Sequence, residues 1–168
     1  RDPLWSRGLG DVYKRQGTDT YQFPRAMLKE DNYDFSFSGL KSAFINTVHN
    51  AEQRGEVLST KDLAASFQAS VVEVLVTKTI RACQEYPVKQ LLIAGGVAAN
   101  QGLREAMRHA ISEQLPAVTL LIPPLKLCGD NAAMIGAAAF IEAEKNHFAS
   151  YNLNAEPGVS FMTISEEG

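Results

Sequence analysis

Residues 91–100 read LLIAGGVAAN, and this stretch decides the fold. The apolar run over residues 88–94 predicts a strand that is covered on both faces. Gly95 and Gly96 then predict a tight turn, and the small residues after them predict a helix packed close to the strand. A strand that leads directly into a helix is the repeating unit of α/β proteins.

The two glycines have two interpretations, which spacing alone leaves equal. In the first, the backbone turns tightly and Asn100 caps the next helix. In the second, a flat ligand such as a nucleobase rests on the bare backbone, and the Asn100 amide bonds to it. The dinucleotide fingerprint GxGxxG and the phosphate loop GxxxxGK[ST] are both absent from the sequence.

A second strand-to-helix unit follows the first. The helix expected over residues 98–114 is stopped by Pro116, residues 117–124 predict a second buried strand, and residues 129–146 predict a last helix rich in Ala. Alternating strands and helices indicate an α/β layer architecture with parallel strands covered by helices. Two strands make an incomplete sheet, so we expect its other strands to lie outside this chain.

Two helices are expected before the first strand. The stretch DFSFSGLKSAFINTVHNAEQRGE has an amphipathic pattern, with Ser36 or Ser38 available as N-cap and Gly55 as its stop. A longer helix is expected over residues 59–86, ended by Pro87. Its apolar residues occupy two sides, so we expect it to lie between two layers.

Composition and boundaries limit the class of protein. Residues 1–16 have no helical or strand periodicity and resemble a non-native or disordered leader; residues 17–161 are expected to form the folded lobe and residues 162–168 a tail. A net charge of −3 gives no general electrostatic reason for nucleic-acid binding. Cys83 and Cys128 lie outside any CxxC pair, which favours reduced thiols in a cytoplasmic protein. The longest stretch of small apolar residues, 132–141, is too short to span a bilayer, so we expect no insertion in a membrane.

Three further residues are candidates for chemistry. Asp130 lies at or next to the start of the last helix, where a carboxylate either caps the helix or binds a cation. Ser38 and Lys41 lie in the first turn of the first helix, where Ser38 is an ordinary capping residue and Lys41 could instead meet a phosphate or an acidic partner. The histidines lack metal-ligand spacing and are expected to be solvated: His49, His109 and His147.

Three stretches, taken together in their order and spacing, resemble one family: DFSFSGLKSAF, LLIAGGVAANQGLRE and LCGDNAAMIGAAAF. This family is the transferase subunit of tRNA threonylcarbamoyladenosine synthesis, formerly called a sialoglycoprotein endopeptidase. The resemblance runs from Gly17 to about Phe161 and is to the C-terminal half of the bacterial form. It implies the C-terminal lobe of an actin-like ATPase fold, in which two related domains close over a nucleotide.

The resemblance also implies a site and a reaction. Gly95 and Gly96 would lie against the nucleoside of a bound threonylcarbamoyl-adenylate, and Asn100 would bond to that ligand. Asp130 would be a ligand of one divalent metal ion, iron or zinc. The family transfers the threonylcarbamoyl group to the exocyclic amine of an adenosine beside the tRNA anticodon. Its partners are tRNA, a degenerate paralogous subunit and a small P-loop ATPase.

The chain departs from the family in a way that bears on activity. The family's metal site also uses a histidine pair of the form HxxxH, and this pattern is absent here. One acidic ligand does not hold a catalytic metal by itself, so we expect the isolated chain to be inactive. Two alternatives stay open: another phosphotransferase of the actin-like fold, and a non-catalytic nucleotide-binding scaffold subunit. The sequence identifies no general acid or base.

Overall fold

The computed structural model describes residues 16–152 and residue 154. Contacts divide the chain into two compact units, Arg1–Gly129 and Asp130–Gly168, and each is described by itself. The leader expected over residues 1–16 lies outside the described residues except for its last position, and the tail expected over residues 162–168 lies outside them entirely.

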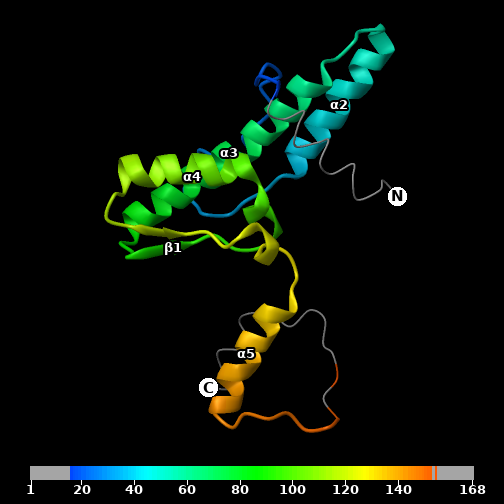
Figure 1. Ribbon diagram of the computed structural model, residues 1–168. Coiled ribbons are helices and arrows are strands. Elements are labelled where there is room, and N and C mark those ends of the chain that lie inside the picture. The colour runs from blue at the N-terminus through cyan, green and yellow to red at the C-terminus, as the bar shows by residue number, and fades with distance from the viewer. Residues whose placement is uncertain (1–15, 153, 155–168) are drawn as a thin grey trace. The chain divides into compact units, whose positions relative to one another are not determined.

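The first unit begins with two helices, α2 (Ser38–Arg54) and α3 (Thr60–Glu85), drawn in Figure 1. Gly55 ends α2 with a φ of 67°, a left-handed conformation that a residue without a Cβ adopts freely. The Ser59 hydroxyl caps α3 by accepting a hydrogen bond from the backbone N–H of Asp62 at 3.3 Å. The predicted end of α2 and start of α3 are therefore confirmed.

The predicted N-cap of α2 is wrong. Phe37 occupies the cap position without a side-chain cap bond, and the hydroxyls of Ser36 and Ser38 lie 3.2 Å from each other instead. Phe37 packs into the apolar cluster between α2 and α3, beside Leu40 and Leu63. Phe37 is partly buried in this cluster, and this packing favours its place at the start of the helix over the local capping preference of serine.

The sheet consists of two parallel strands, β1 (Gln90–Leu92) and β2 (Thr119–Leu121), with Leu91 opposite Leu120. Helix α4 (Gln101–Gln114) connects them. The α/β architecture, the parallel pairing and the incomplete sheet are confirmed. Both strands are shorter than the apolar runs that predicted them, because each has one neighbour with which to form ladder hydrogen bonds in the described part of the chain.

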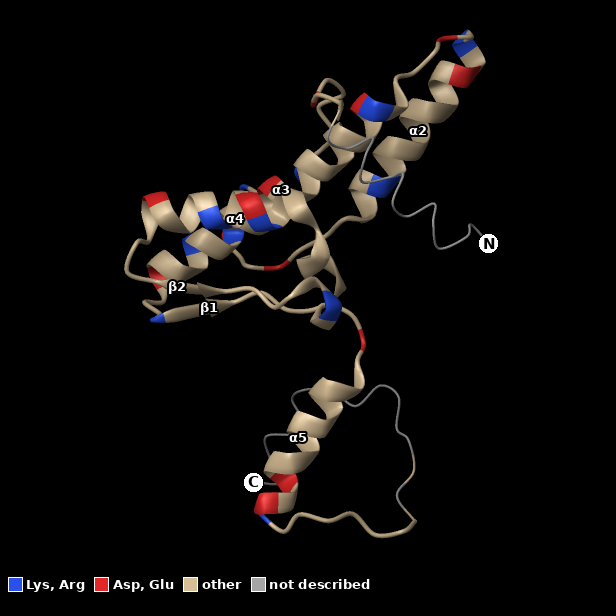
Figure 2. Cartoon of the chain, viewed as in Figure 1, with Lys and Arg blue, Asp and Glu red and all other residues tan. Residues whose placement is uncertain are grey.

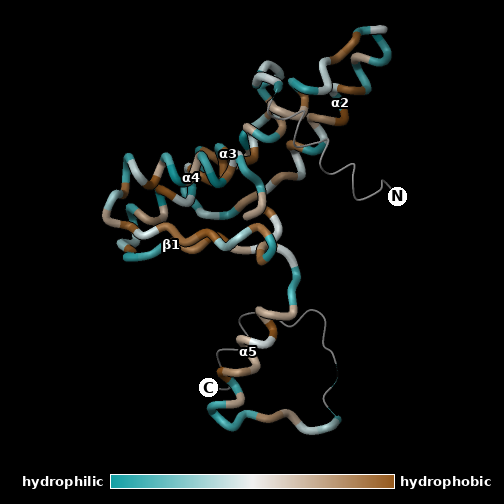
Figure 3. The backbone as a smooth tube through the Cα atoms, viewed as in Figure 1, coloured by the Kyte–Doolittle hydropathy of each residue, from teal (hydrophilic) through white to brown (hydrophobic). Residues whose placement is uncertain are grey.

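Helices cover one face of this sheet. On that face, Leu91 and Leu120 pack against Met107 of α4 and its apolar neighbours. On the opposite face, Leu92 is 64% exposed and Leu121 is 42% exposed. Figure 3 shows that the chain is strongly hydrophobic along the strand labelled β1. Within the first unit, helices therefore cover one of the two faces that were predicted to be covered, and coverage of the other face stays a prediction.

Helix α3 forms the centre of the first unit, as its two apolar sides predicted. One side packs on α4 and the sheet through residues that include Val76 and Ile80, and the other packs on α2 through Phe67 and Val71. By length and composition α3 is also apolar enough to cross a membrane, a test that core helices of water-soluble proteins pass as well. Its contacts in this structure are those of a core helix.

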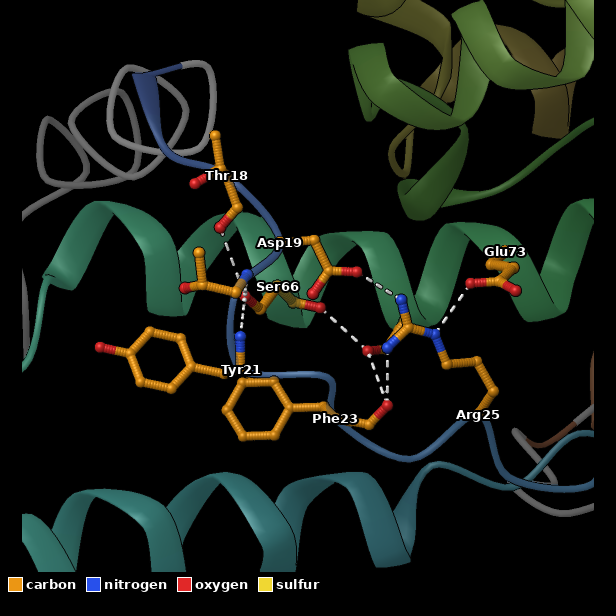
Figure 4. Close-up of polar contacts among 9 residues, drawn as sticks. Thr18, Asp19, Tyr21, Phe23, Arg25, Ser66 and Glu73 are labelled. Atoms are coloured by element: carbon orange, nitrogen blue, oxygen red, sulfur yellow. Dashed lines mark hydrogen bonds and ion pairs between the residues drawn. The ribbon is translucent and has the colours of Figure 1, made fainter.

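Buried and partly buried polar groups fasten the segment before α2 to α3 (Figure 4). The Ser66 hydroxyl accepts hydrogen bonds from the backbone N–H groups of Thr20 and Tyr21 at 3.1 and 3.2 Å. The Arg25 guanidinium donates to the Glu73 carboxylate at 2.8 Å. An extended segment without its own secondary structure thus satisfies its backbone through the side chains of α3.

The loop that leads into α2 is held in the same way. The Lys78 side chain is 1% exposed, and its ammonium donates to the side-chain oxygen of Asn32 at 3.0 Å and the carbonyl of Asp34 at 2.7 Å. Arg81, one turn further along α3, donates to the carbonyl of Glu30 at 3.1 Å and lies over the ring of Tyr33. The start of α2 is therefore positioned by side chains of α3.

The second unit contains helix α5 (Ala132–Glu144), which lies within residues 129–146, the range predicted for the last helix. Its N-cap is Asn131, whose side-chain oxygen accepts a hydrogen bond from the backbone N–H of Met134 at 3.0 Å. No residue of α5 is buried, and four of its large apolar side chains are exposed: Met134, Ile135, Phe140 and Ile141.

Candidate functional site

The carboxyl ends of β1 and β2 lie at the same edge of the sheet, because the strands are parallel. Ligands of open α/β sheets bind beyond this edge. After β1 the chain forms a short 3₁₀ helix, Gly96–Ala99, and then α4. The stretch that predicted a turn or a ligand-binding backbone therefore lies at the edge where a ligand is expected.

Gly95 and Gly96 have different structural roles. Gly95 has φ 85° and ψ 177°, a conformation that is essentially restricted to glycine. A Cβ built on either glycine meets no other atom of the described structure within 4 Å. Gly95 is thus explained by its backbone angles. Neither crowding nor a positive φ explains Gly96, and it leaves the start of the 3₁₀ helix bare.

Asn100 is the N-cap of α4. Its side-chain oxygen accepts a hydrogen bond from the backbone N–H of Leu103 at 2.9 Å, and its side-chain nitrogen donates to the side-chain oxygen of Gln68 at 2.9 Å. The interpretation of Asn100 as a helix cap is confirmed. The contact between Asn100 and a nucleotide stays a prediction.

A small cavity of about 120 Å³ adjoins this turn. Its wall is apolar except for the two hydrogen-bonded amides of Gln68 and Asn100. The lining residues come from α3, the 3₁₀ helix and α4: Phe67, Gln68, Val71, Val72, Leu75, Val97, Asn100 and Leu103. An apolar wall with a few amide donors and acceptors suits one edge of a flat, partly polar group such as a nucleobase.

Gln68 is the residue of this cavity that the sequence did not reveal. It lies in α3, far from the Gly-Gly stretch in sequence. The glycine at position 102 is the one feature of the sequence that agrees with this contact. In the structure, a Cβ on Gly102 would lie 2.8 Å from the side-chain nitrogen of Gln68. Glycine in the first turn of α4 therefore lets the Gln68 amide approach Asn100.

Ser38 and Lys41 lie elsewhere in the first unit. Both belong to α2, and no residue of α2 lines the cavity beside Asn100. Ser38 bonds to a neighbouring turn through its carbonyl, which accepts from the Ser42 hydroxyl at 3.2 Å. Lys41 is exposed. Their polar contact with a ligand or partner stays a prediction, and the structure does not join them to the cavity.

Asp130 is the first residue of the second unit. It precedes the N-cap Asn131, so the interpretation of Asp130 as the helix cap is wrong and its exposed carboxylate is not used to begin α5. Among residues 16–152 and 154, no group of three His, Cys, Asp or Glu side chains could hold a metal ion. The metal that the resemblance implies therefore does not fit the described residues on their own, because Asp130 lacks companion ligands.

These features define an α/β protein with a candidate ligand-binding site at the carboxyl ends of its strands. The chain matches the family described as tRNA N6-adenosine threonylcarbamoyltransferase over residues 7–137. It belongs to this family, whose fold is actin-like.

Three relatives carry the same name. The protein of Enterococcus faecalis is 96% identical over 158 residues, which cover 94% of this chain and 45% of that protein. The protein of Limosilactobacillus fermentum is 64% identical over 94% of this chain and 46% of its own length. That of Lacticaseibacillus casei is 66% identical over 89% of this chain and 44% of its own length. The chain thus spans about half the length of the curated relatives that it matches.

Proposed function

We propose that this chain is the nucleotide-binding half of a tRNA N6-adenosine threonylcarbamoyltransferase. The complete protein would move a threonylcarbamoyl group from threonylcarbamoyl-adenylate to the exocyclic amine of an adenosine next to the tRNA anticodon. The observation that carries the proposal is the 96% identity to a relative of that name. The cavity beside the Gly-Gly turn supports it, since its apolar wall and its two amides suit one edge of a nucleobase.

The role of this chain in the reaction is to bind and orient the adenylate. The bare backbone at Gly96 gives a flat base access to the turn, and the apolar side chains of α3 and α4 exclude water from one of its edges. The paired amides of Gln68 and Asn100 would read polar atoms on that edge. Orientation alone can lower the barrier of a group transfer by several kcal/mol, on the order of 7 or more in favourable cases.

The adenylate site is tested by variants that keep the fold. Asn100→Asp in the complete protein retains an oxygen to cap α4 but removes the amide that donates to Gln68. We expect it to weaken binding of a non-hydrolysable adenylate analogue about tenfold in isothermal titration calorimetry. The matched control is Gln101→Ala, because Gln101 is exposed on the same turn and bonds to Glu105 instead. Equal affinities for the two variants would contradict the site.

Among the described residues, Asp130 is the one ligand that we propose for the metal ion. We place the other ligands of one divalent ion, iron or zinc, outside the described residues. Asp130→Asn in the complete protein should then lower the metal content measured by mass spectrometry, whereas Asp31→Asn, also at an exposed aspartate, should not. Unchanged metal content in Asp130→Asn would remove this residue from the metal site.

The proposed partners are tRNA, the degenerate paralogous subunit and the small P-loop ATPase, all in the cytoplasm. Acidic and basic side chains are interspersed along α2, α3 and α4 (Figure 2), and the net charge is −3. A surface that binds phosphates needs clustered Lys and Arg. We therefore place most of the tRNA contacts outside this chain.

The isolated chain is expected to be inactive, because it supplies one candidate metal ligand and half of a two-domain cleft. The test is transfer of radiolabelled threonylcarbamoyl to unmodified tRNA, with the complete protein as positive control. Transfer by the isolated chain above the level without enzyme would overturn this part of the proposal. Failure of the complete protein to modify tRNA would overturn the proposed function itself.

A further inference from the structure

Arg104 is a buried charged side chain in the first turn of α4. It is 7% exposed. Its Nε donates to the carbonyl of Ala98 at 2.5 Å, and a terminal nitrogen donates to the carbonyl of Pro123 at 2.6 Å. Ala98 belongs to the 3₁₀ helix after β1, and Pro123 to the loop after β2. One guanidinium therefore connects the chain segments that follow both strands.

Cys128 completes this connection. Its sulfur lies 3.0 Å from the same terminal nitrogen of Arg104 and is 3.5 Å from the carbonyl of Pro124, to which it donates. The Cys128 side chain is buried, with the residue 3% exposed. The loop after β2 is thus folded around the guanidinium, from Pro123 to Cys128, and closes over it.

The guanidinium has neutral partners. No carboxylate of the described residues forms an ion pair with Arg104, although a buried charge is normally paired. A core built for stability alone would place an apolar residue here, since an unpaired buried cation is costly. What arginine offers at this position is its geometry. Its planar guanidinium carries several donors and can hold two carbonyls at a fixed separation, which a lysine cannot do.

We propose that Arg104 is a positioning residue that sets the separation between the two loops at the ligand-binding edge of the sheet. The loop after β1 carries the bare backbone of Gly96 and ends at Asn100, and the loop after β2 forms the other side of the edge. Arg104 itself does not touch the ligand. It holds the first loop at a fixed distance from the second, so that Asn100, at the end of the first loop, keeps its contact with Gln68 of α3 where the adenylate base arrives. This inference rests on the proposed function.

The experiment compares Arg104→Lys with Arg108→Lys in the complete protein. Arg108 lies one turn later on α4 and is exposed, so its replacement makes the same chemical change away from the two loops.

Two quantities are measured for each variant. The first is the rate at which iodoacetamide labels Cys128, with buried Cys83 as internal reference, read by peptide mass spectrometry. The second is the pair of steady-state constants, KM for the adenylate and kcat.

For Arg104→Lys we expect Cys128 to be labelled about tenfold faster, because the loop that covers it opens more often, and Cys83 to be labelled at its original rate. We expect KM for the adenylate to rise about tenfold with kcat changed less than about threefold, since ground-state placement is lost. Arg108→Lys should match the unmodified protein in both measurements. Because neither lysine nor glutamine has the planar guanidinium, Arg104→Gln should show the same changes as Arg104→Lys. Full activity in Arg104→Lys but not in Arg104→Gln would show that the positive charge is sufficient, and would overturn the proposal.

Three other results would also overturn it: unchanged Cys128 labelling, faster labelling with unchanged KM, or equal acceleration at Cys83, which would indicate general loosening. The labelling measurement does not need the transfer reaction. If the unmodified complete protein fails to modify tRNA, the proposed function falls while the labelling still decides whether Arg104 holds the two loops together.

Discussion

Helices α4 and α5 begin in the same way and end up in different surroundings. Each is capped by an asparagine whose side-chain oxygen accepts a hydrogen bond from the third following residue, at 2.9 Å for Asn100 and 3.0 Å for Asn131. Helix α4 nevertheless buries five residues, and α5 buries none. A good local start therefore does not decide whether a helix joins a core.

The difference lies in where the apolar residues fall. Those of α4 share one face, which α3 and the sheet cover. Helix α5 is apolar around its whole circumference over most of its length, and its acidic residues, Glu142 and Glu144, lie at its C-terminal end (Figure 2). A helix of this kind needs partners on all sides. The described part of its own unit contains no further helix or strand to supply them.

The largest expected effect contrasts the two helices in packing. Met107→Ala removes a side chain that is 2% exposed between α4 and its neighbours, and we expect it to lower the free energy of unfolding of the first unit by about 3 kcal/mol. Phe140→Ala in α5, at a residue 64% exposed, should change it by less than about 0.5 kcal/mol. Urea unfolding followed by circular dichroism measures both. Equal losses would mean that α5 is packed in solution.

The next contrast concerns two glycines, for which replacement by alanine should have opposite effects on stability. Gly95→Ala forces a Cβ onto a backbone with φ 85°, so we expect a loss of about 1–3 kcal/mol in the same unfolding measurement. Gly136→Ala in α5 meets no other atom within 4 Å in the described structure, and should stabilise that helix by roughly 0.5–1 kcal/mol. Stabilisation by Gly95→Ala would show that the turn relaxes easily to other angles.

A smaller contrast concerns the two caps. Asn100→Ala removes a cap and the hydrogen bond to Gln68, and should cost about 1–2 kcal/mol. Asn131→Ala removes a cap from a helix without buried residues, and should leave the unfolding of the first unit unchanged while reducing the helical circular dichroism signal slightly. A loss of first-unit stability in Asn131→Ala would contradict the division into two units.

The smallest effect is a dependence on pH. The backbone N–H of Thr18 donates to the Asp62 carboxylate at 2.9 Å, and this hydrogen bond holds the pKa of Asp62 below its usual range. Hydrogen bonds from His147 and Lys145 likewise lower the pKa of Glu142 in α5. A lowered carboxylate pKa stabilises the folded state above the unfolded pKa, near pH 4, and the contribution disappears as pH falls through the lowered value.

Amide chemical shifts in a pH titration measure this effect in each unit. The Thr18 amide should titrate with Asp62 below about pH 4, and Asp62→Asn should abolish that step. The backbone amide of Glu142 should shift over a similar acidic range, without a change at Thr18. A Thr18 titration that persists in Asp62→Asn would assign the step to another group.

The sequence predicted much of the fold because several signals were local. Ser59 and Gly55 are read directly as a helix start and a helix stop, and the structure confirms both. The N-cap of α2 was not predictable in this way, since the packing of the partly buried Phe37 against the apolar cluster outweighs the serines beside it. Gln68 was missed for a related reason, because its partner Asn100 is 32 residues away and only the packing of α3 on α4 brings the amides together.

By itself, the sequence determined the family, the order of strands and helices, and the position of the Gly-Gly turn, because these depend on residue type and short-range periodicity. The tertiary structure alone decided which asparagine faces a cavity and that Arg104 joins both loops. Those features depend on contacts between segments far apart along the chain, and the geometry of such contacts is set by the packing of complete helices and strands.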